Sequence, residues 1–115
     1  MGDLSSLVGE QLTAVEFVQD FLQLRFEEAL LTLLVWPDAA DADGISVAFG
    51  QPGYRDALCS VIGEEVANAD YTEGRSVTVE FENGTIFALS LRPEDLDTPL
   101  AGSFQAADGS DLLEF

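Results

Sequence analysis

The sequence predicts an α+β fold, a mostly antiparallel sheet built from two tandem helix-βββ(β) repeats with pseudo-twofold symmetry. Three observations support it: segment 4–37 resembles segment 58–93, each segment opens with a short amphipathic helical pattern, and several stretches alternate between apolar and polar residues. The 115 residues are expected to form a single domain, 1–115, with internal repeats at about 3–50 and 53–107. A chain of this length buries roughly two-thirds of its unfolded surface.

The internal repeat depends on identical residues at matching positions. The alignment needs two one-residue insertions in the second segment, near Gly74–Arg75 and near Asn83–Gly84, where turns are expected. Two unrelated amphipathic meanders could align in a similar way, so this alternative stays open. The identical pairs are Leu4/Leu58, Ser6/Ser60, Gly9/Gly63, Glu10/Glu64, Phe26/Phe81, Glu27/Glu82, Leu33/Leu89 and Pro37/Pro93.

Each repeat is expected to begin with a helix that ends at a glycine. Over 3–8, apolar residues recur three and four positions apart before Gly9, which predicts a helix of one to two turns. Over 54–62 the same spacing predicts a longer helix, beginning after Pro52–Gly53 and ending at Gly63.

Strands are expected after each glycine. The stretches 12–18 and 65–72 predict the first strand of each repeat, and the clean alternation of 21–27 and 76–82 predicts the second. The third strands are expected at 30–36, ended by Pro37, and at 85–91. An acidic loop is expected over 38–44, followed by a fourth strand at 45–49 with Ile45, Val47 and Phe49 alternating. A weaker counterpart is expected within 103–107.

The turn between the second and third strands of the second repeat allows two registers. A two-residue turn at Asn83–Gly84 would put the apolar residues of the third strand in water. A three-residue loop, 82–84, with a bulge at Gly84 pairs Phe81 with Thr85 and turns those residues inward. Burying three large side chains at ~25 cal/mol per Å² stabilises the protein far more than turn types differ, so the bulged loop is predicted.

The third strand of the first repeat is apolar on both faces, which predicts an interaction surface. One face matches the core, and the other would carry apolar side chains beside the second strand. A helix or the C-terminal tail of the same chain could cover this surface, and a homodimer across it is the other expectation. The interaction candidates are Phe21, Leu30, Leu34 and Trp36.

Charge is the strongest compositional signal. The chain has 22 acidic residues and 4 arginines, with no lysine or histidine, and a net charge of −18. Nucleic acid and anionic membranes recruit proteins through lysine and arginine, so neither is expected as a partner. A basic protein partner fits this charge, and so does solubility in a salty cytoplasm. A cytoplasmic location is expected, because the N-terminal segment lacks the pattern of a secretory signal.

No catalytic constellation is present in the sequence, and no cofactor is expected. Without histidine or lysine, only carboxylates remain for acid–base chemistry, so a non-enzymatic role is predicted. A calcium loop is the metal site worth testing. Asp38, Asp41 and Asp43 precede Gly44, but Ala39 and Gly50 stand where an EF-hand needs acidic ligands. These aspartates are therefore weak metal candidates.

Three stretches carry a family resemblance. The runs LVGEQLTAVEFVQDFLQLRF, FGQPGYRDALCSVIG and LRPED resemble a widespread group of small uncharacterised bacterial proteins, across most of the chain. No established activity comes with that group, so the resemblance implies no functional residues. In size, acidity and lack of catalytic groups the chain also resembles bacterial toxin-immunity proteins.

These observations predict a small acidic protein that acts by protein–protein contact, as an immunity-type protein or through another basic partner. A small-molecule or metal-binding module that uses the acidic loops is the first alternative. A self-associating structural domain is the second.

Overall fold

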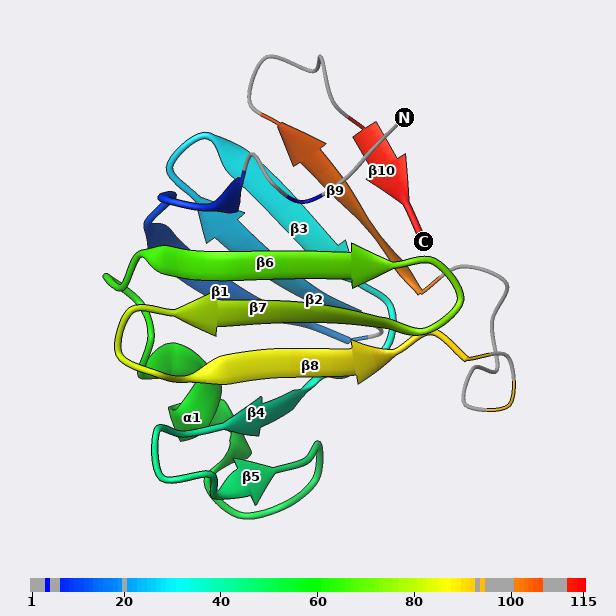
Figure 1. Ribbon diagram of the computed structural model, residues 1–115. Helices are drawn as coiled ribbons and strands as arrows, with labels where there is room; N and C mark the ends of the chain where they lie inside the picture. Colours follow the sequence, from blue (N-terminus) through cyan, green and yellow to red (C-terminus); the bar gives the residue numbers. More distant parts are fainter. Residues whose placement is uncertain (1–3, 5–6, 20, 93, 95–100, 107–111) are drawn as a thin grey trace.

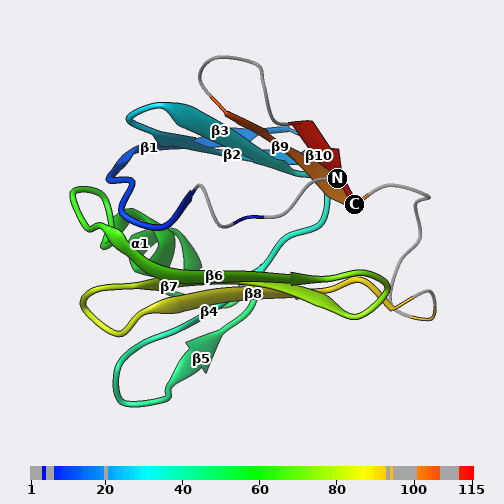
Figure 2. The ribbon, with the colours of Figure 1, turned by 45° about the horizontal axis from the view of Figure 1, so that its top comes forward.

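Two antiparallel sheets of five strands pack face to face in this computed structural model (Figures 1 and 2). The structure describes residues 4, 7–19, 21–92, 94, 101–106 and 112–115. The strand orders are β1-β2-β3-β9-β10 and β5-β4-β8-β7-β6. The elements are β1 (Leu12–Val18), β2 (Phe21–Phe26), β3 (Ala29–Leu33), β4 (Asp38–Ala40), β5 (Ser46–Val47), α1 (Tyr54–Cys59), β6 (Val66–Thr72), β7 (Ser76–Phe81), β8 (Ile86–Ser90), β9 (Gly102–Ala106) and β10 (Leu112–Glu114).

The two meanders, β1-β2-β3 and β6-β7-β8, have matching registers. Leu12 lies opposite Phe26 in one meander and Val66 lies opposite Phe81 in the other. Each pairing then shifts by one residue, which leaves a bulge at the next position of β1 and of β6. The strands predicted at 12–18, 21–27, 65–72 and 76–82 are therefore present, and Gly74–Arg75 and Asn83–Gly84 lie in hairpin loops.

The fourth strands cross over between the meanders. β4, which follows the first meander, pairs with β8 of the second, and β9, which follows the second meander, pairs with β3 of the first. β5 and β10 extend these strands as hairpins. Each sheet is thus completed by a hairpin from the other half of the chain, an exchange visible in Figure 1.

The two halves are also joined where β1 and β6 begin. Gln11 and Glu65 form an isolated antiparallel bridge there. Four backbone hydrogen bonds surround it, two donated by each half: Gly9 N to Val66 O (2.8 Å), Leu12 N to Glu64 O (3.0 Å), Gly63 N to Leu12 O (2.8 Å) and Val66 N to Glu10 O (2.9 Å).

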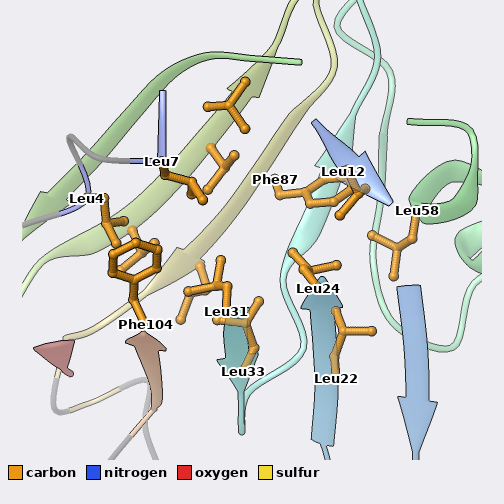
Figure 3. Packing of buried hydrophobic residues seen from close by; sticks show 14 of the residues in the cluster. Leu4, Leu7, Leu12, Leu22, Leu24, Leu31, Leu33, Leu58, Phe87 and Phe104 are labelled. Carbon is orange, nitrogen blue, oxygen red and sulfur yellow. The ribbon is translucent and has the colours of Figure 1, made fainter. Parts of the chain in front are cut away.

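One hydrophobic core fills the space between the sheets (Figure 3). The inward positions of β2, Leu22 and Leu24, are fully buried, as is Phe104 of β9. Figure 3 shows the side chains of Leu4 and Leu7 directed into the same cluster from the N-terminal segment. Burying each such side chain stabilises the fold by about 1.5–3 kcal/mol, so the exchanged hairpin that carries Phe104 is held firmly.

The helical predictions are confirmed only in part. Among the described residues α1 is the single helix, and it ends at Cys59, before the predicted end at 62. Tyr54, Leu58 and Val61 are buried as their spacing predicts, whereas Ile62 is 44% exposed. The other predicted helix, 3–8, lies partly outside the described residues. Within them, Leu7 N donates to Leu4 O, the short bond of a tight turn rather than of an α-helix.

The predicted position of the fourth strand is wrong. The acidic stretch predicted as a loop begins with β4, and only Ser46–Val47 of the predicted strand 45–49 is a strand. Ile45 and Phe49 are 64% and 58% exposed rather than core. The third strand of the first repeat likewise ends at Leu33, before Trp36. These differences follow from the packing of two sheets. The chain leaves the sheet of β3 after Leu33 so that β4 can pair with β8 in the other sheet.

The predicted hairpin at 82–84 is confirmed. Phe81 N donates to Thr85 O at 2.8 Å, and Gly84 has a φ of +92°. The inward residues that follow, Phe87 and Leu89, are 2% and 6% exposed. Hydrophobic burial therefore selected the register over the shorter turn.

Candidate functional site

A groove lined by aromatic side chains opens where the end of β1 approaches the chain that follows β5. Its volume is about 520 Å³. We call it the aromatic groove, and its lining consists of Phe17, Val18, Gln19, Trp36, Phe49, Gly50, Gln51, Gly53, Tyr54, Arg55 and Asp56.

Three rings form a continuous stack in this groove. Trp36 lies between Phe17, at 6.3 Å between ring centroids, and Phe49, at 4.5 Å, with interplanar angles of 15° in both pairs. Tyr54 meets Phe49 edge-on at 5.8 Å. Phe17 and Trp36 are half-buried against the core, but Phe49 is 58% exposed. The stack therefore leads from the core outward to solvent.

The backbone around the stack is fixed by specific hydrogen bonds. The Tyr54 hydroxyl donates to the carbonyl oxygen of Pro37 at 2.5 Å, which joins the start of α1 to the segment that carries Trp36. Ala48 N donates to the Gln51 side-chain oxygen at 2.6 Å and so orders the turn after Phe49. Desolvation by burial raises the pKa of Tyr54, and the charge of Asp38 raises it further. This phenol stays protonated at neutral pH.

A cation already lies on one ring of the groove. The guanidinium carbon of Arg55 is 5.4 Å from the centroid of Phe17, which is the geometry of a cation–π contact. Asp56 is the one carboxylate among the described lining residues. The groove therefore offers aromatic surface, one cation and one carboxylate.

The four predicted interaction residues do not form one surface. Phe21, Leu30 and Leu34 lie on the outer face of the sheet that contains β1, where Phe21 and Leu30 are half-buried and Leu34 is 40% exposed. Trp36, expected beside them, instead packs against the core from within the aromatic groove. The reason is that β3 ends at Leu33, so the strand alternation that predicted Trp36 on the outer face does not extend to that residue.

Strand β4 separates Asp38, its first residue, from Asp41 and Asp43, which follow it. Asp38 lies in β4, while the Asp41 side chain accepts hydrogen bonds from Asp43 N and Ile45 N, both at 2.9 Å. Asp41 thus stabilises the turn between β4 and β5. Within the described residues, no group of three or more metal-ligating side chains is found.

Sequence reasoning missed Phe17, Phe49 and Tyr54 as site residues. Phe17 and Phe49 were assigned to strands and Tyr54 to a buried helical stripe. One feature of the sequence could have identified Phe49 as exposed. It lies in the five-residue stretch 45–49 between Gly44 and Gly50, and so short a stretch between two glycines is a poor candidate for a buried strand.

The comparisons give no relatives for this chain: no family model matches it, and neither a curated protein nor a solved structure does. The resemblance to a group of small bacterial proteins stays a prediction. Within the described residues, no helix is long and apolar enough to cross a membrane.

Proposed function

We propose that this protein binds a basic protein partner through the aromatic groove and acts without catalysis, in the manner of an immunity-type inhibitor. The exposed ring of Phe49, stacked on Trp36 at 4.5 Å, carries this proposal. An aromatic side chain held in place by stacking and left in solvent is typical of the anchors that dominate binding energy at protein interfaces.

The charge of the chain supports a basic partner. With a net charge of −18, the protein attracts cationic surfaces from a distance, although salt at ~0.15 M screens this attraction beyond ~8 Å. Charge therefore accelerates encounter, and contact within the groove sets how long the complex lasts. Arg55 on Phe17 gives an internal example of a guanidinium on an aromatic ring, and the solvent side of Phe49 offers a second ring to a partner's arginine or lysine.

A peptide-display experiment tests this function. Selection of a random peptide library against the immobilised protein should enrich sequences that combine arginine or lysine with an apolar side chain. Phe49→Ser should weaken binding of the selected peptides about tenfold, because the anchor ring is lost. Ile45→Ser is the matched control, since Ile45 is 64% exposed just before β5, as Phe49 is just after it, but does not line the groove. Enrichment of acidic peptides, or equal losses in both variants, would contradict the proposal.

Self-association is a second candidate, favoured by the outer face that carries Phe21, Leu30 and Leu34. Leu22 pairs with Leu33, the last residue of β3, so Phe21 lies near the end of that strand, and Leu34, which follows it, is 40% exposed. If this face joins two copies, light scattering of the wild type at high micromolar concentration gives the mass of a dimer, and Leu34→Glu gives that of a monomer. Trp36→Glu is a poor test, because Trp36 packs against the core.

We also infer that the chain is a tandem duplication with pseudo-twofold symmetry. Support comes from the bulge at equivalent positions of β1 and β6, from the four crossing hydrogen bonds, which form two equivalent pairs, and from the exchange of the β4–β5 and β9–β10 hairpins. The repeat unit is better defined as a meander plus a hairpin than as a helix plus three strands. Leu4 and Leu7 precede β1 as Leu58 and Val61 precede β6, and all four side chains are buried.

A further inference from the structure

Two of the four arginines of this acidic chain lie at one pocket. The pocket has a volume of about 520 Å³ and is lined in part by the end of β8. We call it the arginine pocket. Its lining consists of Val35, Trp36, Asp38, Arg75, Ser76, Ala88, Leu89, Ser90 and Arg92.

The pocket exists because β4 leaves β8 early. Their pairing stops at Asp38 and Ala88, since the preceding residue, Pro37, has no N–H to continue the ladder. β8 continues to Ser90, which pairs with Ser76 of β7. The segment that precedes β4 therefore diverges from the end of β8, and Trp36 forms a wall of the space between them.

The backbones of both arginines are fixed. The carbonyl oxygen of Arg75 accepts a hydrogen bond from Leu91 N at 2.9 Å, which holds the β6–β7 loop against the chain after β8. Arg92 N donates to the Ser90 hydroxyl oxygen at 3.2 Å. Neither bond uses a guanidinium group, and among the residues that the structure describes neither guanidinium group forms an ion pair.

The charge arrangement is unusual for this chain. Acidic residues number 22, yet within the described residues the one ion pair is that of Arg25 with Glu16, on the outer face of the other sheet. Arg75 and Arg92 instead share a pocket in which Asp38 is the single described carboxylate. The described lining therefore has a formal charge of +1, against −18 for the whole chain.

We propose that the arginine pocket binds a small planar carboxylate, held by Arg75 and Arg92 and bordered by Trp36. Guanidinium groups pair with carboxylates through two parallel hydrogen bonds, and Ser76 places a hydroxyl in the same lining. The single negative charge of a monocarboxylate balances the formal charge of +1 on the described lining. A phosphate dianion exceeds that charge, and an acidic macromolecule is repelled by the rest of the surface. The volume also fits a small molecule.

Trp36 is the only tryptophan, so its indole N–H gives one resonance that reports on binding. Titration of the full chain with benzoate should shift this resonance saturably at millimolar concentration. Acetate, which has no planar body, should bind more weakly, and inorganic phosphate should bind no more tightly than benzoate. Absence of a saturable shift with benzoate, or tighter binding of phosphate, would overturn the assignment.

Variants separate this pocket from the aromatic groove, which Trp36 also lines. Replacing both arginines, Arg75→Gln with Arg92→Gln, should weaken benzoate binding about tenfold or more, the effect of losing charge-assisted hydrogen bonds. Arg55→Gln, in the aromatic groove, and Arg25→Gln, on the outer face, remove the same charge elsewhere and should leave the affinity unchanged. If the double variant does not fold, Arg92→Gln alone gives the comparison. A loss caused by Arg55→Gln but not by Arg92→Gln would refute the proposed pocket.

Discussion

Gly84→Ala probes both the bulged hairpin and its contact with the β4–β5 turn. Gly84 has a φ of +92°, and a Cβ placed on it would lie 2.9 Å from the Cβ of Ala42 and 3.3 Å from its Cα. A left-handed conformation costs an alanine about 1–2 kcal/mol relative to glycine. The smaller conformational freedom of alanine in the unfolded chain offsets about 0.4–1 kcal/mol of this. Backbone strain alone therefore destabilises the protein by about 1 kcal/mol.

The contact with Ala42 adds to this strain. Carbon atoms at 2.9 Å repel, because their optimal separation is about 3.5–4.0 Å. Overpacking of a core costs about 1–3 kcal/mol, and the exposed turn at Ala42 can shift, so the lower end of that range applies. We expect Gly84→Ala to lower the free energy of unfolding by about 2 kcal/mol in total.

Urea denaturation followed by the fluorescence of Trp36 measures this loss. Gly74→Ala is the matched control, because Gly74 also has a positive φ, +73°, in the β6–β7 hairpin, but a Cβ there would meet no atom within 4 Å. It should cost about 1 kcal/mol, from strain alone. At a slope of about 1–3 kcal/mol per M, the two midpoints should differ by about 0.3–1 M urea.

A double-mutant cycle with Ala42→Gly isolates the contact. Removing the Ala42 side chain takes away the 2.9 Å contact, so Gly84→Ala should cost less in this background, by about 1 kcal/mol. The reasoning fails if Gly84→Ala costs no more than Gly74→Ala, or if its cost is the same with and without the Ala42 side chain.

Three further predictions concern other parts of the fold. Burial raises the pKa of Tyr54, so its contribution to stability should be fully present below the unfolded pKa near 10 and be lost as pH rises above it. In urea titrations, Tyr54→Phe should therefore reduce the loss of stability at alkaline pH, and the raised pKa of Tyr71 leaves a smaller remaining loss. Gly102→Ala should disrupt the pairing of β9 with β3, since a Cβ would collide with the carbonyl oxygen of Thr32. Limited proteolysis checks this, because the variant should be cleaved faster than the wild type. Fragments 1–51 and 52–115 should each lack near-UV circular dichroism and recover it when mixed, because each sheet takes a hairpin from the other fragment; a native-like spectrum from either fragment alone would contradict this.

The local elements of the meanders could be predicted from the sequence. Alternation identified β2 and β7 because both have one face on the core, where the period of two is directly visible. The loop at 82–84 could be predicted for a related reason. Only one of its two registers buries Phe87 and Leu89, and the burial energy is much larger than the difference between turns.

The exchanged hairpins could not be predicted in the same way. β4 is only Asp38–Ala40, and its central residue, Ala39, is 2% exposed, but an acidic stretch with one buried alanine has no visible alternation. Its strand structure depends on pairing with β8, a partner far away in the sequence. The position of Trp36 depends on the same pairing of β4 with β8. The aromatic groove, which Trp36 lines, therefore depends on that pairing as well.

Trp36 connects the two proposed sites for a topological reason. The link between β3 and β4 is the segment by which the first half of the chain reaches the sheet of the second half, so its residues lie where the two sheets meet. Trp36 stands in that link and lines both the aromatic groove and the arginine pocket. A ligand that displaces Trp36 in one site therefore changes the wall of the other site. Since binding free energies are reciprocal, any effect of a carboxylate in the arginine pocket on partner affinity must equal the effect of the partner on carboxylate affinity.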